Sequence, residues 1–450
     1  MRFPVPEPVL GAIGRLNSAG HEAYLVGGCV RDDYLGIPPH DYDICTSAYP
    51  DEILNIFSQE KTLTVGKAHG TITVILNSLP IEITTYRADG PYRDGRHPDY
   101  VSFTNNLAED LKRRDFTMNA LVWHPKTGIK DLFGGREDCD KQIIRCIGSP
   151  AKRFTEDALR ILRALRFAST FSFTVEKTAV FAMLDKKDML KNISVERVAL
   201  ELNKLMTGAR PAEVFSQHPR ILFTVLPLLE PSYHCAQRSV FHSYDVWEHT
   251  LRALSLTPPD LAVRWATLFH DSGKPHTVTY DPDGTTHFRG HQTVSVRLVR
   301  ETMQALKQSN SLTKTVSLLV AHHDDRIGPD NLQVWLSKLG PDLFFKLMHV
   351  QRADLLAHAP HVAKRVDSHD ALVKKAEELI ANGACLSLGD LAIDGKTLIE
   401  NGFDSGPFLG ETLNFLLERV INGFEQNDRQ SLLASALKRL EERKKQLKLQ

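Results

Sequence analysis

The sequence predicts an α/β domain at the N-terminal end, built as a mixed β-sheet with flanking helices and followed by an all-helical remainder. The whole is therefore a multi-domain α+β protein. Short β-branched or aromatic segments alternate with helix-like segments through the first 150 residues, whereas nearly every later segment carries apolar residues at helical spacing. The length of 450 residues indicates several domains, because a domain holds about 150 residues.

The strands expected in the N-terminal part are short and rich in β-branched or aromatic residues. Each is bounded by Gly, Pro, Asn or Asp, the residues that commonly end strands. We expect strands over residues 23–26, 42–45, 70–76, 80–87 and 120–123.

Amphipathic helices are expected from residue 149 onward, because segments such as EDALRILRALRFAS and SVERVALELNKLM repeat apolar residues at three and four positions. Turn-forming residues interrupt this pattern and divide the chain into four parts. These are a head over residues 1–148, a helical neck over 149–210, a helical body over 211–381 and a helical tail over 382–450. The charged end of the tail is either a solvated helix end or an RNA contact.

Composition excludes several classes of protein. Hydrophobic residues make up 42% and charged residues 24%, as in ordinary globular proteins, so a wholly disordered chain is excluded. Fifty-five Lys and Arg balance fifty-five Asp and Glu, which argues against a uniformly basic coat and leaves a local basic face open. The sequence has no apolar run long enough for a membrane span and no signal peptide, so we expect a cytoplasmic protein. The six cysteines form no CxxC pair, so we expect reduced, mostly buried thiols.

Two adjacent glycines, Gly27 and Gly28, follow the first expected strand and open a helix that carries Arg31. Adjacent glycines let backbone N–H groups approach a phosphate, the start of a helix adds its positive end, and Arg31 adds a fixed charge. A glycine pair alone is usually a turn. In this order the residues outline a cradle for a triphosphate.

A pair of carboxylates follows ten residues later, at Asp41 and Asp43. Side chains two positions apart on a strand project from the same face, so the two carboxylates are expected to meet at one point. A hard divalent ion such as Mg²⁺, shared with the phosphates of a nucleotide, relieves their repulsion and supports phosphoryl or nucleotidyl transfer.

Two further segments concentrate charge. Arg114 and Asp115 in RRDFTMNA either cap and pair with their neighbours or recognise the sugar and phosphates of a nucleotide. In EDALRILRALR we expect one helix, with its apolar stripe on one side and Asp157 and Arg160 one turn apart on the other. Such a row is usually a solvated, ion-paired face, but a carboxylate beside a guanidinium also matches the hydrogen-bonding edge of a nucleobase.

The ordered series LVGGCVRD, DYDI, RRDFTMNA, EDALRILRALRFAS and SVERVALEL resembles the bacterial class II tRNA nucleotidyltransferases, the CCA-adding enzymes of the DNA polymerase β superfamily. The resemblance is dense over residues 20–205. It implies a template-independent enzyme that adds C, C and A to the tRNA 3′ end from CTP and ATP and releases pyrophosphate. Its partners would be tRNA, CTP and ATP, and its cofactor Mg²⁺.

The resemblance also implies roles for individual residues. Glu82, on the strand after the aspartate pair, is the candidate third carboxylate, and residues 86–98 resemble the family's mobile loop that helps the change from C to A addition. The remaining roles are metal binding by Asp41 and Asp43, triphosphate binding by Gly28 and Arg31, sugar contact by Arg114 and Asp115, base reading by Asp157 and Arg160, and support of the nucleotide pocket by Arg163 and Arg166.

The helical body holds a second set of metal-binding residue types. His249, the adjacent pair His270 and Asp271, and Asp354 lie in three helix-like runs, and imidazole and carboxylate ligands converging from different helices suit a divalent metal. The ordered set is similar to the HD phosphohydrolase superfamily, which implies a second divalent metal of unknown identity and hydrolysis of a phosphate ester. His291 and the pair His322 and His323 are candidate ligands for a further metal.

Several functions stay open at this point. CC-adding enzymes, A-adding enzymes and poly(A) polymerases share most of these motifs. A phosphohydrolase with a nucleotide-sensing head and a non-enzymatic RNA-binding protein are rivals from other classes. RNA contact has local support, because residues 152–166 hold five Lys or Arg against two acidic residues. The sequence leaves the oligomeric state undetermined.

Overall fold

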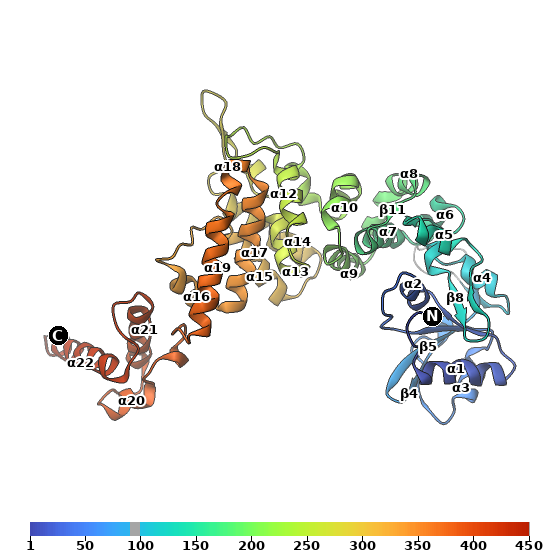
Figure 1. Cartoon of the computed structure of the whole chain (residues 1–450), viewed down its shortest axis with the longest axis horizontal. Helices are drawn as coiled ribbons and strands as arrows, with labels where there is room; N and C mark the ends of the chain where they lie inside the picture. Colours follow the sequence, from blue (N-terminus) through green and yellow to red (C-terminus); the bar gives the residue numbers. More distant parts are fainter. Residues whose placement is uncertain (91–99, 450) are drawn as a thin grey trace. The chain divides into compact units, whose positions relative to one another are not determined.

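The computed structural model describes residues 1–90 and 100–449, which separate into two compact units (Figure 1). The first unit comprises Met1–Pro227 together with Ala305–Gln308, and the second comprises Leu228–Gln304 and Ser309–Gln450. The structure does not test the finer division of these units into head, neck, body and tail, which stays a prediction.

A seven-stranded mixed sheet forms the head, in the order β3-β4-β5-β2-β1-β8-β9. Strands β2 and β5 run parallel, and the other neighbours are antiparallel. All five expected strands are present within a few residues, whereas β3 and β9 were not expected. The strands are β1 (Ala23–Val26), β2 (Asp43–Thr46), β3 (Lys61–Leu63), β4 (Thr71–Leu76), β5 (Leu79–Thr85), β8 (Val122–His124) and β9 (Gly128–Lys130).

Helices flank this sheet, as the sequence predicts. In α1 (Glu7–Ser18), Val9, Ala12, Ile13 and Leu16 repeat at three- and four-residue spacing and are fully buried. Figure 1 shows α1 beside α3 (Pro50–Ile56) against the sheet. The other helices of the head are α2 (Gly28–Tyr34), α4 (Leu107–Lys112) and α5 (Gly135–Asp140).

A two-stranded ribbon, β6 (Arg87–Asp89) with β7 (Val101–Phe103), leads into and out of residues 91–99. Those nine residues lie outside the described part of the chain. Most of the loop expected at 86–98 therefore stays a prediction.

The rest of the first unit is mostly helical. The prediction that it contains helices alone was wrong. Two short parallel strands, β10 (Ile143–Ile144) and β11 (Thr174–Val175), join the head to the neck. The single helix expected over residues 156–166 is also interrupted, because Asp157 has an extended backbone between two helices. The helices are α6 (Pro150–Glu156), α7 (Leu159–Phe171), α8 (Lys177–Lys186), α9 (Val195–Met206), α10 (Pro211–Gln217) and α11 (Pro219–Val225).

The second unit packs its helices around α17, which contacts α12, α13 and α15. A hairpin of two short strands, β12 (Thr279–Tyr280) and β13 (Thr286–His287), is the exception to its helical character. The helices are α12 (Val246–Ser255), α13 (Leu261–Phe269), α14 (His291–Ala305), α15 (Asn310–His322), α16 (Leu332–Leu339), α17 (Pro341–Ala357), α18 (Pro360–Ala363), α19 (Val366–Ala381), α20 (Gly395–Glu400), α21 (Pro407–Ile421) and α22 (Arg429–Leu449). The last three share a core with Leu398, Leu416 and Leu432 at its centre.

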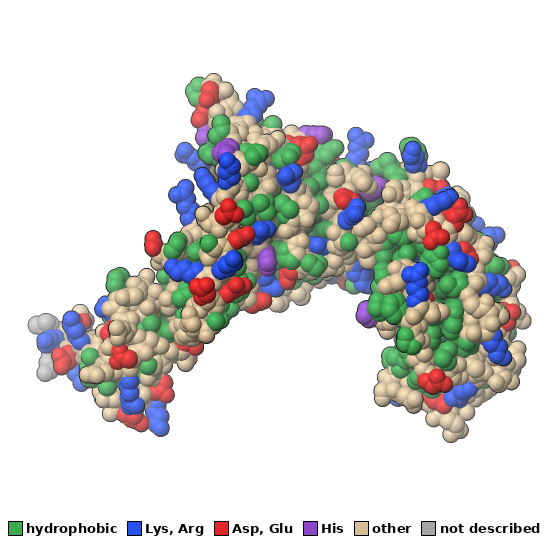
Figure 2. Space-filling view, viewed as in Figure 1, with side chains coloured by type: hydrophobic (Ala, Val, Ile, Leu, Met, Phe, Trp, Pro, Cys, Tyr) green, Lys and Arg blue, Asp and Glu red, His purple; other side chains and the backbone are tan. Residues whose placement is uncertain are grey.

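The surface matches the balanced composition. Figure 2 shows Lys and Arg side chains interspersed with Asp and Glu over the visible face. Across residues 1–90 and 100–449, no helix combines the length and apolar character that a membrane span requires. All six cysteines are free thiols and five are buried, as expected.

Candidate active site

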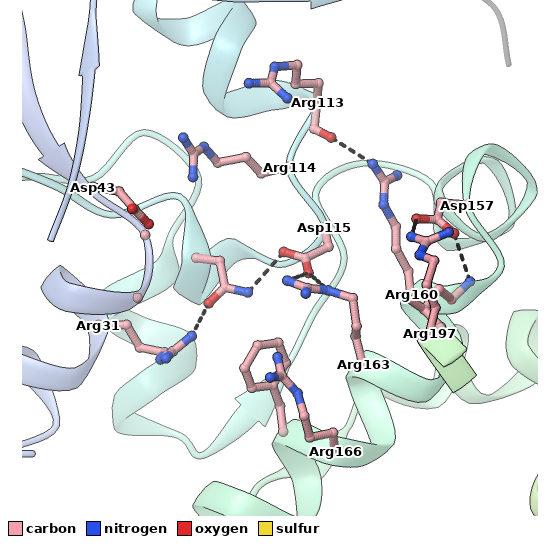
Figure 3. Close-up of a pocket in the computed structure, with 15 residues that line it drawn as sticks. Arg31, Asp43, Arg113, Arg114, Asp115, Asp157, Arg160, Arg163, Arg166 and Arg197 are labelled. Carbon is pink, nitrogen blue, oxygen red and sulfur yellow. Dashed lines mark hydrogen bonds and ion pairs between the residues drawn. The ribbon is translucent and has the colours of Figure 1, made fainter. Parts of the chain in front are cut away.

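A pocket of about 470 Å³ opens in the first unit where the head meets α7 and α9. The turn between β1 and α2, the start of β2 and the segment after α4 form its other walls. Its lining residues are Gly27, Gly28, Arg31, Asp43, Arg113, Arg114, Asp115, Asn119, Asp157, Leu159, Arg160, Arg163, Arg166, Phe167 and Arg197 (Figure 3).

The lining is strongly cationic although the chain as a whole is neutral. Seven arginines and three aspartates contribute, an excess of four positive charges. A concave surface of one sign focuses the electrostatic potential and attracts a ligand of opposite charge. The pocket therefore suits a polyanion such as a nucleoside triphosphate.

The glycine turn lies at the wall beside Arg31 and Arg114. Gly27 has a φ of +78°, and a Cβ at this position would lie 3.2 Å from Arg114 Nη1. Only glycine adopts this backbone without strain and leaves the guanidinium its place. Arg31 is buried: its Nε donates to Asp32 Oδ1 at 2.8 Å and its Nη1 donates to Asn119 Oδ1.

Carboxylates meet next to this wall, although not as the sequence predicts. Asp41 precedes β2 and is exposed, so the expectation that it shares a strand with Asp43 was wrong. Asp43 instead faces Glu82 in register on the parallel strand β5, and paired residues on neighbouring strands project from one face. Asp43 is itself exposed at the pocket, but desolvation by the surrounding protein, with Glu82 and Asp41, raises its pKa to about 6, while Arg114 acts to lower it. Asp43 and Glu82 therefore lie side by side, and carboxylate oxygens are donors that suit a hard divalent cation.

Asp115 lies at the centre of the pocket wall (Figure 3). Its Oδ2 accepts from Arg163 Nε at 2.7 Å and its Oδ1 accepts from Asn119 Nδ2 at 2.9 Å. Although burial acts to raise it, the pKa of Asp115 lies well below its usual value because of Arg163 and Asn119. The carboxylate is therefore ionised and fixed in position.

Asp157 and Arg160 both line the pocket but do not lie on one helix face, contrary to the prediction. Asp157 Oδ1 accepts from the backbone N–H of Leu159 at 3.0 Å, and Oδ2 pairs with Arg197 at 2.8 Å. Arg160 donates to Glu156 Oε2 at 2.7 Å and, as Figure 3 shows, to the carbonyl oxygen of Arg113 at 3.1 Å. Each group that was expected to read a base thus has a partner of its own.

Sequence reasoning missed several pocket residues, among them Phe167 and Arg197. Glu201, on α9 with Arg197, pairs with Arg166 at 3.0 Å and was missed as well. Arg197 and Glu201 lie four positions apart in SVERVALEL, so their shared helix face was a signal that the sequence offered.

The second unit contains the histidine and aspartate set expected there. His249 Nε2 lies 2.8 Å from Asp354 Oδ1 and 3.3 Å from His270 Nε2, and His270 Nε2 lies 3.2 Å from Asp271 Oδ2. His249, His270 and Asp271 are buried. Although burial acts to raise it, the pKa of Asp271 is well below its ordinary value because His270 and Lys274 lie beside it. The four residues therefore form one cluster with the donor types of a divalent metal site.

Two further imidazoles adjoin this cluster on the other side of Asp271. Asp271 Oδ1 lies 3.3 Å from His291 Nε2 and 3.8 Å from His323 Nε2. His322 points elsewhere, since its Nδ1 pairs with Asp325 Oδ2 at 2.6 Å. Only one member of the histidine pair thus joins the cluster. A pocket of about 450 Å³ beside it is lined in part by Asp271, Lys274, His291 and His323.

Three family models match the chain. The Poly A polymerase head domain matches residues 23–145, the RNA- and SrmB-binding site of polymerase A matches residues 172–217, and tRNA nucleotidyltransferase domain 2 matches residues 291–436.

Similar proteins cover nearly the whole chain. A CCA-adding enzyme of Geobacillus thermodenitrificans is 34% identical over 443 residues, 97% of this chain and 98% of the relative. The solved structure of the Bacillus stearothermophilus CCA-adding enzyme in complex with CTP is 30% identical, with a TM-score of 0.70 and 98% of each chain covered. The Thermotoga maritima CCA-adding enzyme complexed with tRNA_CCA is 20% identical, with a TM-score of 0.61 over 96% of this chain and 94% of that one, and shares the fold.

Proposed function

The chain belongs to the family of CCA-adding enzymes, and from this premise we propose that the pocket of the first unit binds the nucleotide to be added. The protein is a template-independent tRNA nucleotidyltransferase that adds C, C and A to the tRNA 3′ end. It uses CTP and ATP, releases pyrophosphate and depends on a divalent metal.

The observation that carries the assignment of the pocket is its charge. An excess of four positive charges matches the four negative charges of a free nucleoside triphosphate. Arg31, Arg163 and Arg166 converge on one part of the lining (Figure 3). Guanidinium groups bind phosphate oxygens with two parallel hydrogen bonds, so this is where the triphosphate is expected. Gly28 leaves the backbone accessible beside Arg31.

The metal is Mg²⁺ in this proposal, and Asp43, Asp41 and Glu82 hold it. A metal bound there would supply positive charge to the α-phosphate as the tRNA 3′ hydroxyl attacks it and pyrophosphate leaves. The residues of the chain position the reactants: Arg114 and Asp115 hold the sugar, and Arg163 fixes Asp115. The mutual repulsion of Asp43, Glu82 and Asp41 supports this role.

Asp157 and Arg160 read the base in this proposal, as acceptor and donor groups. Both line the pocket, and their own partners set where their remaining hydrogen-bonding atoms point. A base that matches both groups gains two hydrogen bonds, and a base that mismatches leaves buried polar groups unpaired.

The experiment that tests the function uses three tRNA transcripts: one without the 3′ CCA, one ending in CC and one complete. Each is incubated with the protein, Mg²⁺ and labelled CTP or ATP. Addition of C, C and A that then stops is the expected result. Addition of A to the CC end alone would mean an A-adding enzyme, addition that stops at CC a CC-adding enzyme, and an unlimited A tail a poly(A) polymerase. No incorporation on any transcript would contradict the proposal.

A second function rests on the cluster in the second unit. We propose that His249, His270, Asp271 and Asp354 hold a divalent metal and that this site hydrolyses a phosphate ester, as the resemblance to the HD phosphohydrolases implies. The close convergence of four predicted ligands from α12, the end of α13 and α17 supports it.

The test compares the wild-type protein with the double variant His270→Ala, Asp271→Asn. Bound metal, measured by elemental analysis, and hydrolysis of p-nitrophenyl phosphate and bis(p-nitrophenyl) phosphate should both be lost in the double variant. His322→Ala is the matched control, because His322 lies next in sequence to His323 and outside the cluster. Equal metal content and hydrolysis in all three proteins would refute the second site, while CCA addition should stay unchanged throughout.

A further inference from the structure

Two phenylalanines on α7 stack against guanidinium groups that line the nucleotide pocket. Phe167 and Phe171 lie four positions apart and stack with ring centroids 5.8 Å apart and an interplanar angle of 12°. The Arg31 guanidinium carbon lies 5.0 Å from the Phe167 centroid and 4.7 Å from the Phe171 centroid. Arg166 stacks on Phe167 at 4.0 Å. These distances are within the range of cation–π attraction.

The Arg31 guanidinium is thus held on its faces by aromatic rings and along its edge by hydrogen bonds. Asp32 Oδ1 accepts from Nε and lies 2.8 Å from Nη2, Asn119 accepts from Nη1, and the two rings of α7 lie against the guanidinium. A Cβ on Gly28 would lie 3.7 Å from Arg31 Nη2, so this edge borders the glycine turn. A guanidinium has five N–H donors, and those left over lie at the pocket lining.

The two rings also stabilise guanidinium cations that lie close to one another. Burial lowers the pKa of Arg166, Glu201 acts to raise it, and the charges of Arg163 and Arg31 act to lower it, so the neighbouring cations repel one another. The negative face of an aromatic ring attracts a cation without neutralising it. Asp32 and Glu201 each occupy part of an edge of these guanidiniums, whereas the rings contact only their faces and leave the remaining N–H donors for phosphate.

We propose that Phe167 and Phe171 are positioning residues for the triphosphate, forming an aromatic rail that holds the Arg31 and Arg166 guanidiniums ready for phosphate oxygens. This inference rests on the proposed function of the pocket. Phe116 meets Phe167 edge-on at 5.9 Å and anchors the rail to the head. The rail acts on phosphates, which CTP and ATP share, and leaves the choice of base to other groups.

The test replaces Phe171 by Leu, which keeps an apolar side chain and removes the ring. KM for CTP on a tRNA without CCA and KM for ATP on a tRNA ending in CC should each rise about fivefold, the effect of one lost cation–π contact. The two increases should be equal, with kcat and base selection unchanged, because only triphosphate binding is weakened. Phe171→Tyr, which keeps the ring, should retain the wild-type KM.

Two further variants separate positioning from packing. Phe173→Leu is the matched control, because Phe173 packs on Phe171 and no arginine of the described residues stacks on it. In an Arg31→Gln background, Phe171→Leu should no longer change KM, since the cation that it holds is gone. A similar loss in Phe173→Leu, or a full effect of Phe171→Leu in the Arg31→Gln background, would overturn the proposal.

Calorimetry of CTP binding without tRNA gives a readout separate from catalysis. It is measured for the same set of variants, and for Phe171→Met if the Leu variant fails to fold. A wild-type protein that adds no nucleotide would refute the proposed function instead.

Discussion

At the scale of single residues, the carboxylate group depends on strand register as much as on sequence spacing. Asp43 and Glu82 are neighbours because β2 and β5 are parallel and in register, although 38 residues separate them in the chain. Asp41 contributes from the segment before β2. Tertiary structure therefore brings Asp43 and Glu82 together, and the charge of Asp41 acts on Asp43.

Asp43→Asn should lower the rate of nucleotide addition by about 10³-fold, equal to about 4 kcal/mol, because it removes one charge from the proposed metal ligands. The fold should persist, since Asn has nearly the same size. Single-turnover incorporation of labelled CTP measures the effect. Asp51→Asn, at an exposed carboxylate that pairs with Lys67, serves as the control and should be without effect. Wild-type activity in Asp43→Asn would exclude a metal-binding role for this residue.

The guanidinium of Arg160 has a fixed orientation. Its three contacts with Glu156 and the carbonyl groups of Arg153 and Arg113 fix the guanidinium plane. Lysine carries the same charge without the planar fork of donors, so it is not equivalent in such a site.

Arg160→Lys should reduce the preference for CTP and ATP over UTP and GTP by about tenfold, because a bidentate contact contributes roughly 1–3 kcal/mol of base discrimination. KM for the triphosphate should change less than the ratio of kcat/KM values between bases. Competition assays with pairs of nucleotides measure that ratio. Arg145→Lys, at an arginine that pairs with Asp138 and Glu176 away from the pocket, is the control. Unchanged selectivity would remove base reading from Arg160.

At the scale of elements, the break between α6 and α7 sets the positions of Asp157 and Arg160, the groups proposed to read the base. Asp157 caps α7 through the N–H of Leu159 and is tied to α9 by Arg197. Four of the five basic residues at 152–166 are turned inward, since Arg153 pairs with Glu156 and the other three arginines line the pocket. Only Lys152 is exposed, so this segment offers little as an RNA-binding face.

Arg197→Met should weaken base selection without weakening triphosphate binding, because it releases Asp157 and leaves the pocket arginines on α7 in place. Met keeps the length and helix propensity of the replaced side chain. We expect a loss of selectivity of several-fold, in the same competition assay. Lys204→Met, at an exposed position of the same helix, controls for the lost charge. An equal loss in both variants would show that α9 acts through net charge alone.

The sequence predicts where helices and strands lie better than it predicts where a helix is broken. The strands of the head follow from β-branched segments between turn residues, and the four side chains of the second unit that cluster together were predicted from their residue types. The break at Asp157 could not be predicted, because EDALRILRALR has continuous helical periodicity and tertiary pairing with Arg197 decides the local backbone. Phe167 was given no role for a related reason: nothing in the sequence shows that Arg31, 136 positions away, stacks on it.

At the scale of the whole molecule, the two units carry different chemistry. The first holds the arginine-lined pocket and the second holds the histidine cluster. The contact between the tail and tRNA, and the cytoplasmic location expected from the sequence, stay predictions.

Calorimetry should therefore resolve two thermal transitions that respond to different ligands. A ligand at a hundred times its Kd stabilises the state that binds it by about 2.7 kcal/mol. CTP with Mg²⁺ should raise the transition of the first unit, and the chelator EDTA should lower the transition of the second. His270→Ala should abolish the EDTA response and leave the CTP response. A single transition that moves with both ligands would contradict the independence of the units.

Four residues within the second half of the chain belong to the first unit. In this segment, Ala305–Gln308, Lys307 Nζ lies 2.6 Å from Glu196 Oε1, and Gln308 exchanges two side-chain hydrogen bonds of 3.1 Å with Asn203. A stop codon after Pro227 would delete these contacts together with the second unit. The two proposed activities are therefore not separable by simple truncation, and a gene that lost its 3′ half would encode an incomplete nucleotidyltransferase.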